Sequence, residues 1–535
     1  MKHRQLILFA AFSALLLTLP WLGIMPGWIL FVAFLPLLIV EDHIFQQRQT
    51  KSSIAFFGYS YLSFWLWNAL TTWWIVHSTL IGGILIVFLN ATFMASVWWL
   101  FHLMKRRFHT RTANLSLVTF WIAFEYLHSN WEIAWPWLCL GSGFANQVKL
   151  VQWYEYTGVF GGTLWILFMN LVFFQLYKNI SKKGFKPAIP QLTWLAIAIT
   201  LPVVYSVRQY HDYREIGRDC EIVILQPNID PYQEKFSGMS PEKQLSLLVQ
   251  LADSLTTAST EYVVGPETAL HPLDENDEMS HHPYIDPFRQ RAQHSPRLNY
   301  ILGATTRKFF DPGDKIPATA RKSQNDPEQY YDLYNSALQI NQDERIQTYH
   351  KSILVSGVEK MPFGKYLTFL ENFMIDLGGT TGSLGSQPEP SNFTSTTGTQ
   401  VAPVICYESV FGEYVSKFIK KGADLIIVIT NDGWWKNTPG HRQHFSFARL
   451  RAIETRRGIA RSANTGISAF INQRGDIVQQ SNWWERTALR GTLNLNNQLT
   501  FYVRYGDYIA RISSFLAVLL LLLLLANLRM GKLKK

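Results

Sequence analysis

The chain has 535 residues, which is too long for a single ordinary hydrophobic core, so two or more folding units are expected. Hydrophobic residues make up 48% of the chain and charged residues only 16%, well below the charged share of a typical soluble protein. The net charge is +10, but many of the cations flank apolar stretches and no zinc-ligand spacing or nucleic-acid module is present, which argues against a nucleic-acid partner and for a membrane protein.

The N-terminal part of the chain contains apolar segments near the roughly 20 residues that a membrane-spanning helix needs. The first block, Leu6–Val40, is interrupted near Pro20 and Pro26 and is interpreted as two spans. A cleaved signal peptide is the alternative, but no small-residue cleavage site follows and the next span begins at once. About seven spans are predicted before residue 210 and one at the C-terminus, the later ones over Ile54–Val76, Leu80–Met104, Leu115–Leu127, Val159–Tyr177, Ile189–Tyr205 and Ser513–Leu528.

The distribution of Lys and Arg in the loops predicts the orientation of these spans. Alternate loops from the N-terminus onwards, and the tail after the last span, are rich in basic residues, whereas the loop from His128 to Thr157 on the other side holds only Lys149. Both termini are therefore predicted to be cytoplasmic. The stretch from about Val207 to Asp507 is predicted to lie on the periplasmic or outer face.

The outer stretch is predicted to be an α/β domain, because short β-branched runs alternate with helical patterns. The expected domains are a membrane domain over 1–206, a catalytic domain over 207–507 and a C-terminal span with a cytoplasmic tail over 508–535. Two polar stretches, Asp311–Asp332 and Gly378–Gly398, are expected to be long loops. Predicted strands are Glu221–Leu225, Tyr262–Val264, Tyr300–Ala304, Ser336–Ile340, Val401–Ile405, Leu425–Ile429 and Ile467–Ile471, and predicted helices are Glu242–Leu255, Glu413–Lys421 and Phe445–Arg457.

Three reactive side chains follow predicted strands, where sites in open α/β sheets collect. Glu267 comes just after Tyr262–Val264, Lys351 follows the strand near Ser336–Ile340, and Cys406 ends Val401–Ile405. A thiol must lose its proton to attack a carbonyl, a carboxylate can take that proton, and an amine can stabilise the oxyanion together with the backbone N–H of Tyr407. A helix expected after Ser409 would add a positive dipole end near the thiol.

Each of these residues has a simpler interpretation when it is taken alone. A cysteine after an apolar run is usually a small buried side chain, a glutamate after a strand is usually a cap or a solvated loop residue, and a lone lysine is usually a surface charge. The sparse, odd set of Cys139, Cys220 and Cys406 excludes a disulfide framework and suits a reactive thiol.

In order and with their neighbours, these residues resemble a known family. GPETA around Glu267, the Y-x-K-x-x-LV pattern around Lys351 and CYES from Cys406 are similar to the Glu–Lys–Cys motifs of the nitrilase (carbon–nitrogen hydrolase) superfamily, whose members share an αββα sandwich fold. Such a domain between about seven spans and one more looks like the apolipoprotein N-acyltransferases, and the likeness covers nearly the whole chain. Further similar motifs are WPWLCLG, VQWYEYTGVFGG, LQPNI, TNDGWW and RLRAIETRRGIARSANTGIS.

The resemblance implies roles for particular residues. Glu267 would be the general base, Lys351 the amine that stabilises the oxyanion, and Cys406 the nucleophile. Glu359 would match the family's extra glutamate, although the usual Pro-Phe-Gly-Glu run is replaced by SGVE, and Tyr407 and Glu408 would match the pair after the cysteine. Arg449, Glu454 and Asn464 also match motif positions, and we expect the first two to pair along their helix.

The implied reaction moves an acyl chain from a membrane phospholipid to a Cys406 thioester, and then to the amine of a lipoprotein's diacylglyceryl-cysteine. It needs neither metal nor cofactor, and a monomer is expected. Water must be kept from the thioester. The candidate lid or substrate-binding segments are Met361–Leu377, which contains Phe363, and the pair Trp434 and Trp435. The alternative is that these aromatic residues take part in ordinary packing.

Two rival functions remain open from the sequence. A membrane-anchored amidase or nitrilase would use the same acyl-enzyme and pass the acyl group to water. A transporter or scaffold would only bind, and paired interrupted helices or charges within the spans would favour it. Glu125 and His128, near the end of one span, give this interpretation weak support.

Overall fold

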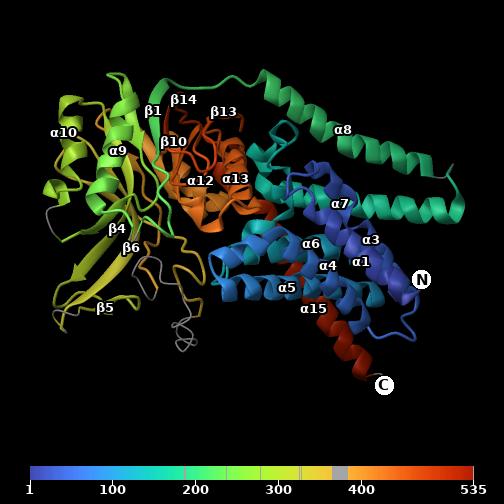
Figure 1. Ribbon diagram of the computed structural model, residues 1–535. Helices are drawn as coiled ribbons and strands as arrows, with labels where there is room; N and C mark the ends of the chain where they lie inside the picture. The colour runs from blue at the N-terminus through green and yellow to red at the C-terminus, as the bar shows by residue number, and fades with distance from the viewer. Residues whose placement is uncertain are drawn as a thin grey trace. The chain divides into compact units, whose positions relative to one another are not determined.

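The computed structural model describes residues 1–185, 188–235, 238–276, 279–323, 326, 328–363 and 383–533 (Figure 1). The chain separates into two compact units. One is built from Met1–Val76, Leu80–Asp212 and Tyr505–Lys535, and the other from His77–Thr79 and Tyr213–Arg504. The limits predicted for the domains stay predictions.

The first unit is helical, and its helices lie at each of the predicted apolar segments. Among the described residues, five segments are long and apolar enough to cross a membrane: Gly27–Gln46, Leu80–Arg107, Tyr154–Lys182, Ile189–Asp212 and Tyr508–Met530. The number of spans, predicted as about eight, stays a prediction. The helices are α1 (His3–Thr18), α2 (Leu30–Ala33), α3 (Leu35–Gln46), α4 (Ile54–Thr72), α5 (Leu80–Arg107), α6 (Thr110–Ser129), α7 (Tyr154–Lys183), α8 (Ile189–Asp212) and α15 (Tyr508–Leu533).

Charged side chains meet at one end of this unit. Lys105 of α5 forms ion pairs with Glu41 and Asp42 of α3, and Lys178 of α7 lies 2.8 Å from Asp42. His102 Nδ1 is 2.7 Å from Glu41 Oε1, and the side chains of His102 and Glu41 are fully buried. Buried charges in a membrane domain are costly unless they are paired, so these contacts hold three helices together.

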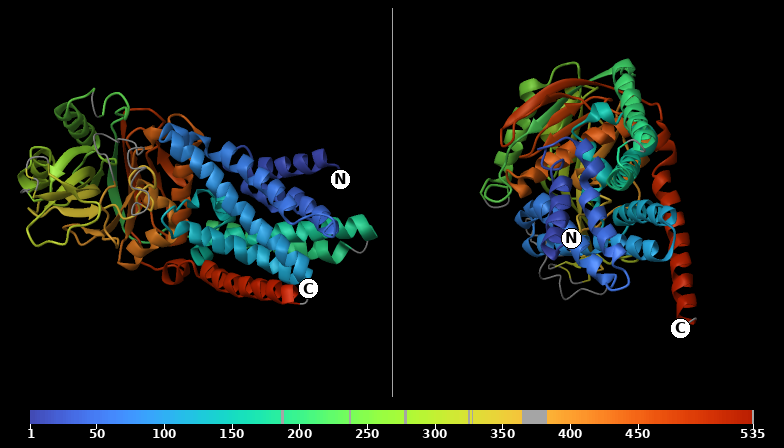
Figure 2. Two further views of the ribbon diagram at one scale, coloured as in Figure 1. Left: turned by 90° about the horizontal axis from the view of Figure 1, so that it is seen from below. Right: turned by 90° about the vertical axis from the view of Figure 1, so that its right-hand side faces the viewer.

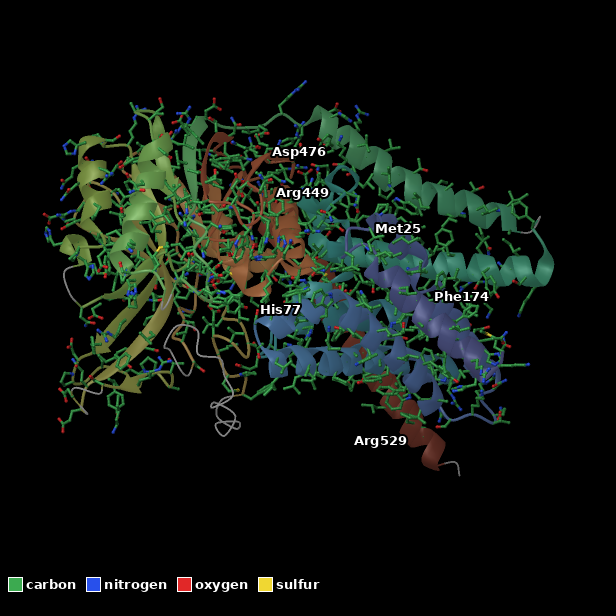
Figure 3. All side chains as sticks on the ribbon, in the orientation of Figure 1. Met25, His77, Phe174, Arg449, Asp476 and Arg529 are labelled. Carbon is green, nitrogen blue, oxygen red and sulfur yellow. The ribbon has the colours of Figure 1, made fainter. Side chains whose placement is uncertain are left out.

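The same end of the helical unit carries the chain termini and basic loops. The start of α1 and the end of α15 lie at one end of the unit in both views (Figures 1 and 2). Arg529 lies near the end of α15, and Phe174 lies on α7 (Figure 3). Arg106, at the end of α5, donates to the carbonyls of Arg48 and Lys51 in the loop after α3. The basic loops on α3 and α5 therefore share one end of the unit.

The second unit contains two mixed sheets among its described residues. The first has the order β14-β1-β2-β4-β6-β5, with β3 also paired to β4 and β7 to β6; the second has the order β13-β12-β11-β10-β9-β8. The first sheet contains β1 (Asp219–Gln226), β2 (Thr260–Val264), β3 (Leu270–Asp274), β4 (Asn299–Phe310), β5 (Arg321–Lys322), β6 (Tyr330–Ile340), β7 (Gln347–His350) and β14 (Thr487–Asn494), and the second β8 (Phe393–Thr394), β9 (Gln400–Ile405), β10 (Leu425–Thr430), β11 (Ile459–Ala463), β12 (Ala469–Ile471) and β13 (Ile477–Gln480).

The two sheets face each other between two layers of helices (Figure 1). Helices α9 (Pro241–Leu255) and α10 (Asp286–His294) pack on the first sheet, where Leu248 and Phe288 join its buried core. Helices α12 (Gly412–Lys420) and α13 (Pro439–Thr455) cover the second. Every residue of β10, LIIVIT, is buried, as expected for a central parallel strand with both faces covered. The unit is therefore an αββα sandwich, which confirms the expected fold class.

Several local predictions were wrong. The stretch Asp311–Asp332 contains β5 and the start of β6 as well as a loop. Helix α13 ends at Thr455, because Arg456 adopts a left-handed backbone with φ 50°. Arg449, which was expected to pair with Glu454, donates to the carbonyl of Gly475 at 2.9 Å; Arg449 is labelled in Figure 3. Glu454 pairs instead with Arg451.

Candidate active site

Glu267, Lys351 and Cys406 follow three strands that end at the same side of the sandwich. Glu267 lies in the turn after β2, Lys351 directly follows β7, and Cys406 directly follows β9. The turn that holds Glu267 is closely packed, since a Cβ at Gly303 of β4 would lie 2.6 Å from the Glu267 Cα. Only glycine allows this approach. Strand ends from both sheets thus converge on one point.

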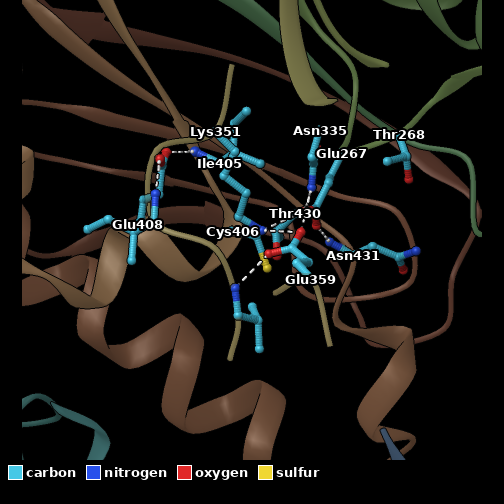
Figure 4. Close-up of polar contacts among 12 residues, drawn as sticks. Glu267, Thr268, Asn335, Lys351, Glu359, Ile405, Cys406, Glu408, Thr430 and Asn431 are labelled. Atoms are coloured by element: carbon cyan, nitrogen blue, oxygen red, sulfur yellow. Dashed lines mark hydrogen bonds and ion pairs between the residues drawn. The ribbon is translucent and has the colours of Figure 1, made fainter. Parts of the chain in front are cut away.

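Lys351 lies between two carboxylates in the interior (Figure 4). Its Nζ is 2.8 Å from Glu359 Oε1 and 3.2 Å from Glu267 Oε1, and its side chain is 1% exposed. Burial by itself would lower the pKa of Lys351, but the charges of Glu359 and Glu267 outweigh burial and hold the pKa above its usual range. The amine is therefore a fixed cation, as an oxyanion-stabilising group must be.

Two asparagines that the sequence did not single out orient the carboxylates. Asn335 of β6 donates from Nδ2 to Glu267 Oε1 at 2.7 Å and to Glu359 Oε1 at 2.9 Å. The backbone N–H of Asn431, just after β10, donates to Glu267 Oε2 at 3.1 Å. Glu359 Oε2 also accepts from the backbone N–H of Val355 at 2.8 Å. With both oxygens held, neither carboxylate is free to turn away from Lys351.

Cys406 sits on a sharp turn. Its φ of 49° is in the left-handed region, which is uncommon for a residue other than glycine and often marks a functional site. The residues Cys406–Val410 form a 3₁₀ turn, and α12, the helix expected after Ser409, begins at Gly412. The thiol is 8% exposed and points into the cluster with Glu267, Glu359 and Thr430 (Figure 4).

Burial raises the pKa of the Cys406 thiol well above its usual value, Glu267 raises it further, and Lys351 opposes both. The thiol is therefore protonated at neutral pH. A nucleophile in this state needs a neighbouring base to remove its proton as it attacks. Glu267, which is buried as deeply as Cys406, is placed to serve as that base.

Comparisons with known proteins identify the family of the chain. The family model for carbon-nitrogen hydrolases matches residues 224–498, and the model for the N-terminal domain of apolipoprotein N-acyltransferase matches residues 13–172. Apolipoprotein N-acyltransferase of Chlorobaculum tepidum is 30% identical over 492 residues, which cover 90% of this chain and 89% of that protein. The chain belongs to the apolipoprotein N-acyltransferase family.

Other matches are more distant. Apolipoprotein N-acyltransferase of Geobacter metallireducens is 26% identical over 522 residues, covering 95% of this chain and 93% of that protein. Among solved structures, a nitrilase-superfamily protein of Saccharomyces cerevisiae is 14% identical with a TM-score of 0.36, and the match covers 53% of this chain and 92% of that one.

Glu408, one of the pair after the cysteine, connects two loops of this family member. Its Oε1 accepts from the backbone N–H groups of Ser352 at 2.7 Å and Ile353 at 3.2 Å and from the Tyr349 hydroxyl at 2.6 Å. Its Oε2 accepts from the N–H of Ile405 at 2.9 Å. This buried carboxylate therefore ties the residues next to Cys406 to those next to Lys351. Tyr407 is also buried, and its ring packs edge-on against Phe411.

The aromatic candidates differ in packing and exposure. Trp435 packs edge-on against His444, and Trp434 packs edge-on against Tyr232; both are part-buried in a 3₁₀ turn after β10. Phe363 is 40% exposed. The rest of the candidate segment up to Leu377, and the first residues of Gly378–Gly398, lie outside the described residues. The role of these three as a lid or substrate-binding surface stays a prediction.

Proposed function

We propose that the chain transfers an acyl group from a membrane phospholipid, through a thioester on Cys406, to the N-terminal amine of the diacylglyceryl-cysteine of lipoproteins. The observation that carries the proposal is the buried Glu267–Lys351–Cys406 cluster in a chain that also has apolar helices long enough to cross a membrane. Membership of the apolipoprotein N-acyltransferase family supports the same substrates.

The first half-reaction loads the enzyme. Glu267 takes the thiol proton while Cys406 Sγ attacks the ester carbonyl of the phospholipid, and the oxyanion is stabilised by Lys351 and the backbone N–H of Tyr407. The tetrahedral intermediate collapses with cleavage of the ester C–O bond. Glu267 returns the proton to the departing oxygen, so a lysophospholipid leaves and the acyl group stays on sulfur.

The second half-reaction transfers the acyl group from Cys406 to the lipoprotein. The lipoprotein amine attacks the thioester carbonyl, Glu267 takes a proton from the nitrogen, and the same donors stabilise the oxyanion. Cleavage of the C–S bond gives the amide, and the proton on Glu267 returns to the Cys406 sulfur. One chain supplies every residue in this scheme, which supports a monomeric enzyme.

The transferase is distinguished from an amidase by what accepts the acyl group. We expect the purified protein in lipid nanodiscs to gain the mass of one acyl chain on Cys406 in the absence of acceptor, and to pass it to a synthetic diacylated lipopeptide with a free amine. Intact-protein and lipopeptide mass spectrometry measure both steps. Release of ammonia from simple amides, with no acylated lipopeptide, would establish the amidase instead.

We also propose that both termini are cytoplasmic and that the α/β unit lies on the outer face of the inner membrane. The excess of Lys and Arg in alternate loops supports this orientation, as does the gathering of the basic loops after α3 and α5 at the end that carries the termini.

A cysteine-labelling experiment tests the orientation. The three native cysteines are all buried, and in a variant with all three replaced by serine we expect Ser386→Cys to react with a membrane-impermeant maleimide in intact spheroplasts. Gln49→Cys, in the loop between α3 and α4, is the matched control and should react only after permeabilisation. Both positions are exposed. The reverse pattern would invert the proposed topology.

A further inference from the structure

A buried polar network contacts the backbone of the nucleophile, Cys406. His444 of α13 is 1% exposed, and its Nε2 is 3.1 Å from the backbone carbonyl oxygen of Cys406. The same nitrogen is 3.0 Å from Ser409 Oγ, and Ser409 itself donates to the Cys406 carbonyl at 2.7 Å. The roles described so far do not use these contacts.

The carbonyl that these groups hold belongs to a residue with a strained backbone. A left-handed backbone at a residue with a side chain persists only where its surroundings fix it, and Cys406 has a φ of 49°. Two hydrogen-bond donors on one carbonyl fix the peptide plane between Cys406 and Tyr407. That plane sets both the direction of the thiol and the direction of the Tyr407 N–H.

The imidazole ring is itself held from its other nitrogen. His444 Nδ1 is 3.0 Å from Asp432 Oδ1, and Asp432 Oδ2 accepts from Arg461 Nη2 at 2.7 Å. Arg461 Nη2 also lies 3.2 Å from His444 Nδ1, and Arg461 Nη1 donates to the Ile467 carbonyl at 2.6 Å. Thr430, whose hydroxyl donates to Asp432 Oδ1 at 2.9 Å, closes the network next to the thiol.

The charges around the ring are permanent. Burial would raise the pKa of Asp432, but Arg461 and His444 outweigh burial and lower it, so the carboxylate stays ionised. The Cys406 carbonyl can only accept a hydrogen bond, so the ring holds this carbonyl by donating from Nε2. The side chains of Asp432, His444 and Arg461 are at most 1% exposed, so water does not compete for these bonds.

We infer that His444 is a positioning residue for the nucleophile: oriented by Asp432 and Arg461, it holds the Cys406 carbonyl and thereby aims the thiol and the Tyr407 N–H at the scissile carbonyl. The inference rests on the proposed role of Cys406 as the acylated residue. Because His444 is 1% exposed and lies against the backbone of Cys406, its loss should slow the chemical step and leave phospholipid binding unchanged. If His444 only filled space, its loss would not slow the chemical step while leaving binding unchanged. A smaller side chain with a similar N–H donor would then not restore the rate.

The test compares three single variants by the rate of Cys406 acylation, measured by quenched-flow mass spectrometry over a range of phospholipid concentrations in mixed micelles. His444→Leu removes the donor, and we expect an acylation rate constant about a hundredfold lower with a half-saturating phospholipid concentration within about twofold of wild type. His444→Gln places an amide N–H near the former Nε2 and should recover the rate to within about tenfold. His441→Leu, one turn earlier on α13, removes a buried imidazole that stacks on Trp483 and should leave the rate within about twofold.

Each outcome decides the inference. Acylation of His444→Leu at the wild-type rate would overturn it. So would an equal fall of the acylation rate constant in the Leu and Gln variants, or a change in the half-saturating phospholipid concentration alone. Asp432→Asn keeps the side-chain volume and frees the ring, so it gives a second test if the Leu variant does not fold; a wild-type rate there would also overturn the inference. A wild-type protein that never carries an acyl group on Cys406 would instead remove the proposed function itself.

Discussion

Replacing Cys406 with serine is expected to lower acyl transfer by at least about 10⁴-fold, with no acyl adduct left on the protein. A hydroxyl is far more weakly acidic than a thiol, and burial of this position already raises the pKa of the thiol, so Glu267 could not generate an alkoxide there. Serine is slightly smaller than cysteine and the turn is unchanged, so the free energy of unfolding should change by no more than about 1 kcal/mol. Intact-protein mass spectrometry and a lipopeptide acylation assay measure the loss.

The other two cysteines provide matched controls. Cys139 lies in a buried polar cluster with Glu125 and Thr163, and Cys220 lies within β1. Burial raises the pKa of the Cys220 thiol, as it does for Cys406. Among the described contacts, however, no lysine amine lies next to Cys220. Serine at either position should leave most of the activity. Full activity in the Cys406→Ser protein, or loss of the acyl adduct in either control, would move the nucleophile to another residue.

Replacing Lys351 with methionine is expected to lower both activity and stability. Methionine fills a similar volume but leaves Glu267 and Glu359 facing each other in the interior without their cation. Removing one partner of a buried ion pair typically costs about 3–5 kcal/mol, because the remaining charge is uncompensated. We expect a loss of that size in the free energy of unfolding, and a fall in acylation of about 10³-fold from the lost oxyanion partner.

The pH dependence separates this explanation from simple loss of packing. Lys351 has a raised pKa, so in the wild type its contribution is fully present at pH 5 and pH 8 alike. In the variant, two carboxylates without a cation bind a proton more readily than glutamates of the unfolded chain, which titrate near pH 4.3. The folded variant then holds more protons than the unfolded one above that pH, so its stability should fall as the pH rises.

Thermal unfolding at pH 5 and pH 8 measures this difference. The deficit of Lys351→Met relative to wild type should be larger at pH 8, and an equal deficit at both values would attribute the loss to packing alone. Lys417→Met is the control, because Lys417 forms a half-exposed surface pair with Glu389. Such pairs contribute less than about 1 kcal/mol, so this variant should resemble wild type at both pH values.

The sequence was sufficient to predict the αββα fold and to select three residues that the structure brings to one place. Glu267 and Cys406 each follow a strand of buried, β-branched residues, and that signal is local and strong. Lys351 was also selected, but the strand directly before it, QTYH, was not predicted. This strand has only four residues and is only partly buried, so its pattern was too short to detect.

The missed residues depend on contacts that no local pattern encodes. Asn335 reaches Glu267 and Glu359 because β6 pairs with β4 and β7 in a particular register, and register is a property of the whole sheet. His444 lies 38 residues from the carbonyl that it contacts. Glu408 accepts from the backbone N–H of Ser352, which is 56 residues away along the chain.

The ion pairs among α3, α5 and α7 have a consequence for the order in which the chain is assembled. Helix α3 carries Glu41 and Asp42, and their partner Lys105 is about 60 residues further along the chain. A nascent α3 therefore enters the bilayer with carboxylates that no cation yet neutralises, which a lone helix tolerates poorly. Synthesis must reach the end of α5 before the first pair can close, and the end of α7 before Lys178 adds the second cation. The early helices of this protein should consequently remain with the insertion machinery until those later segments arrive.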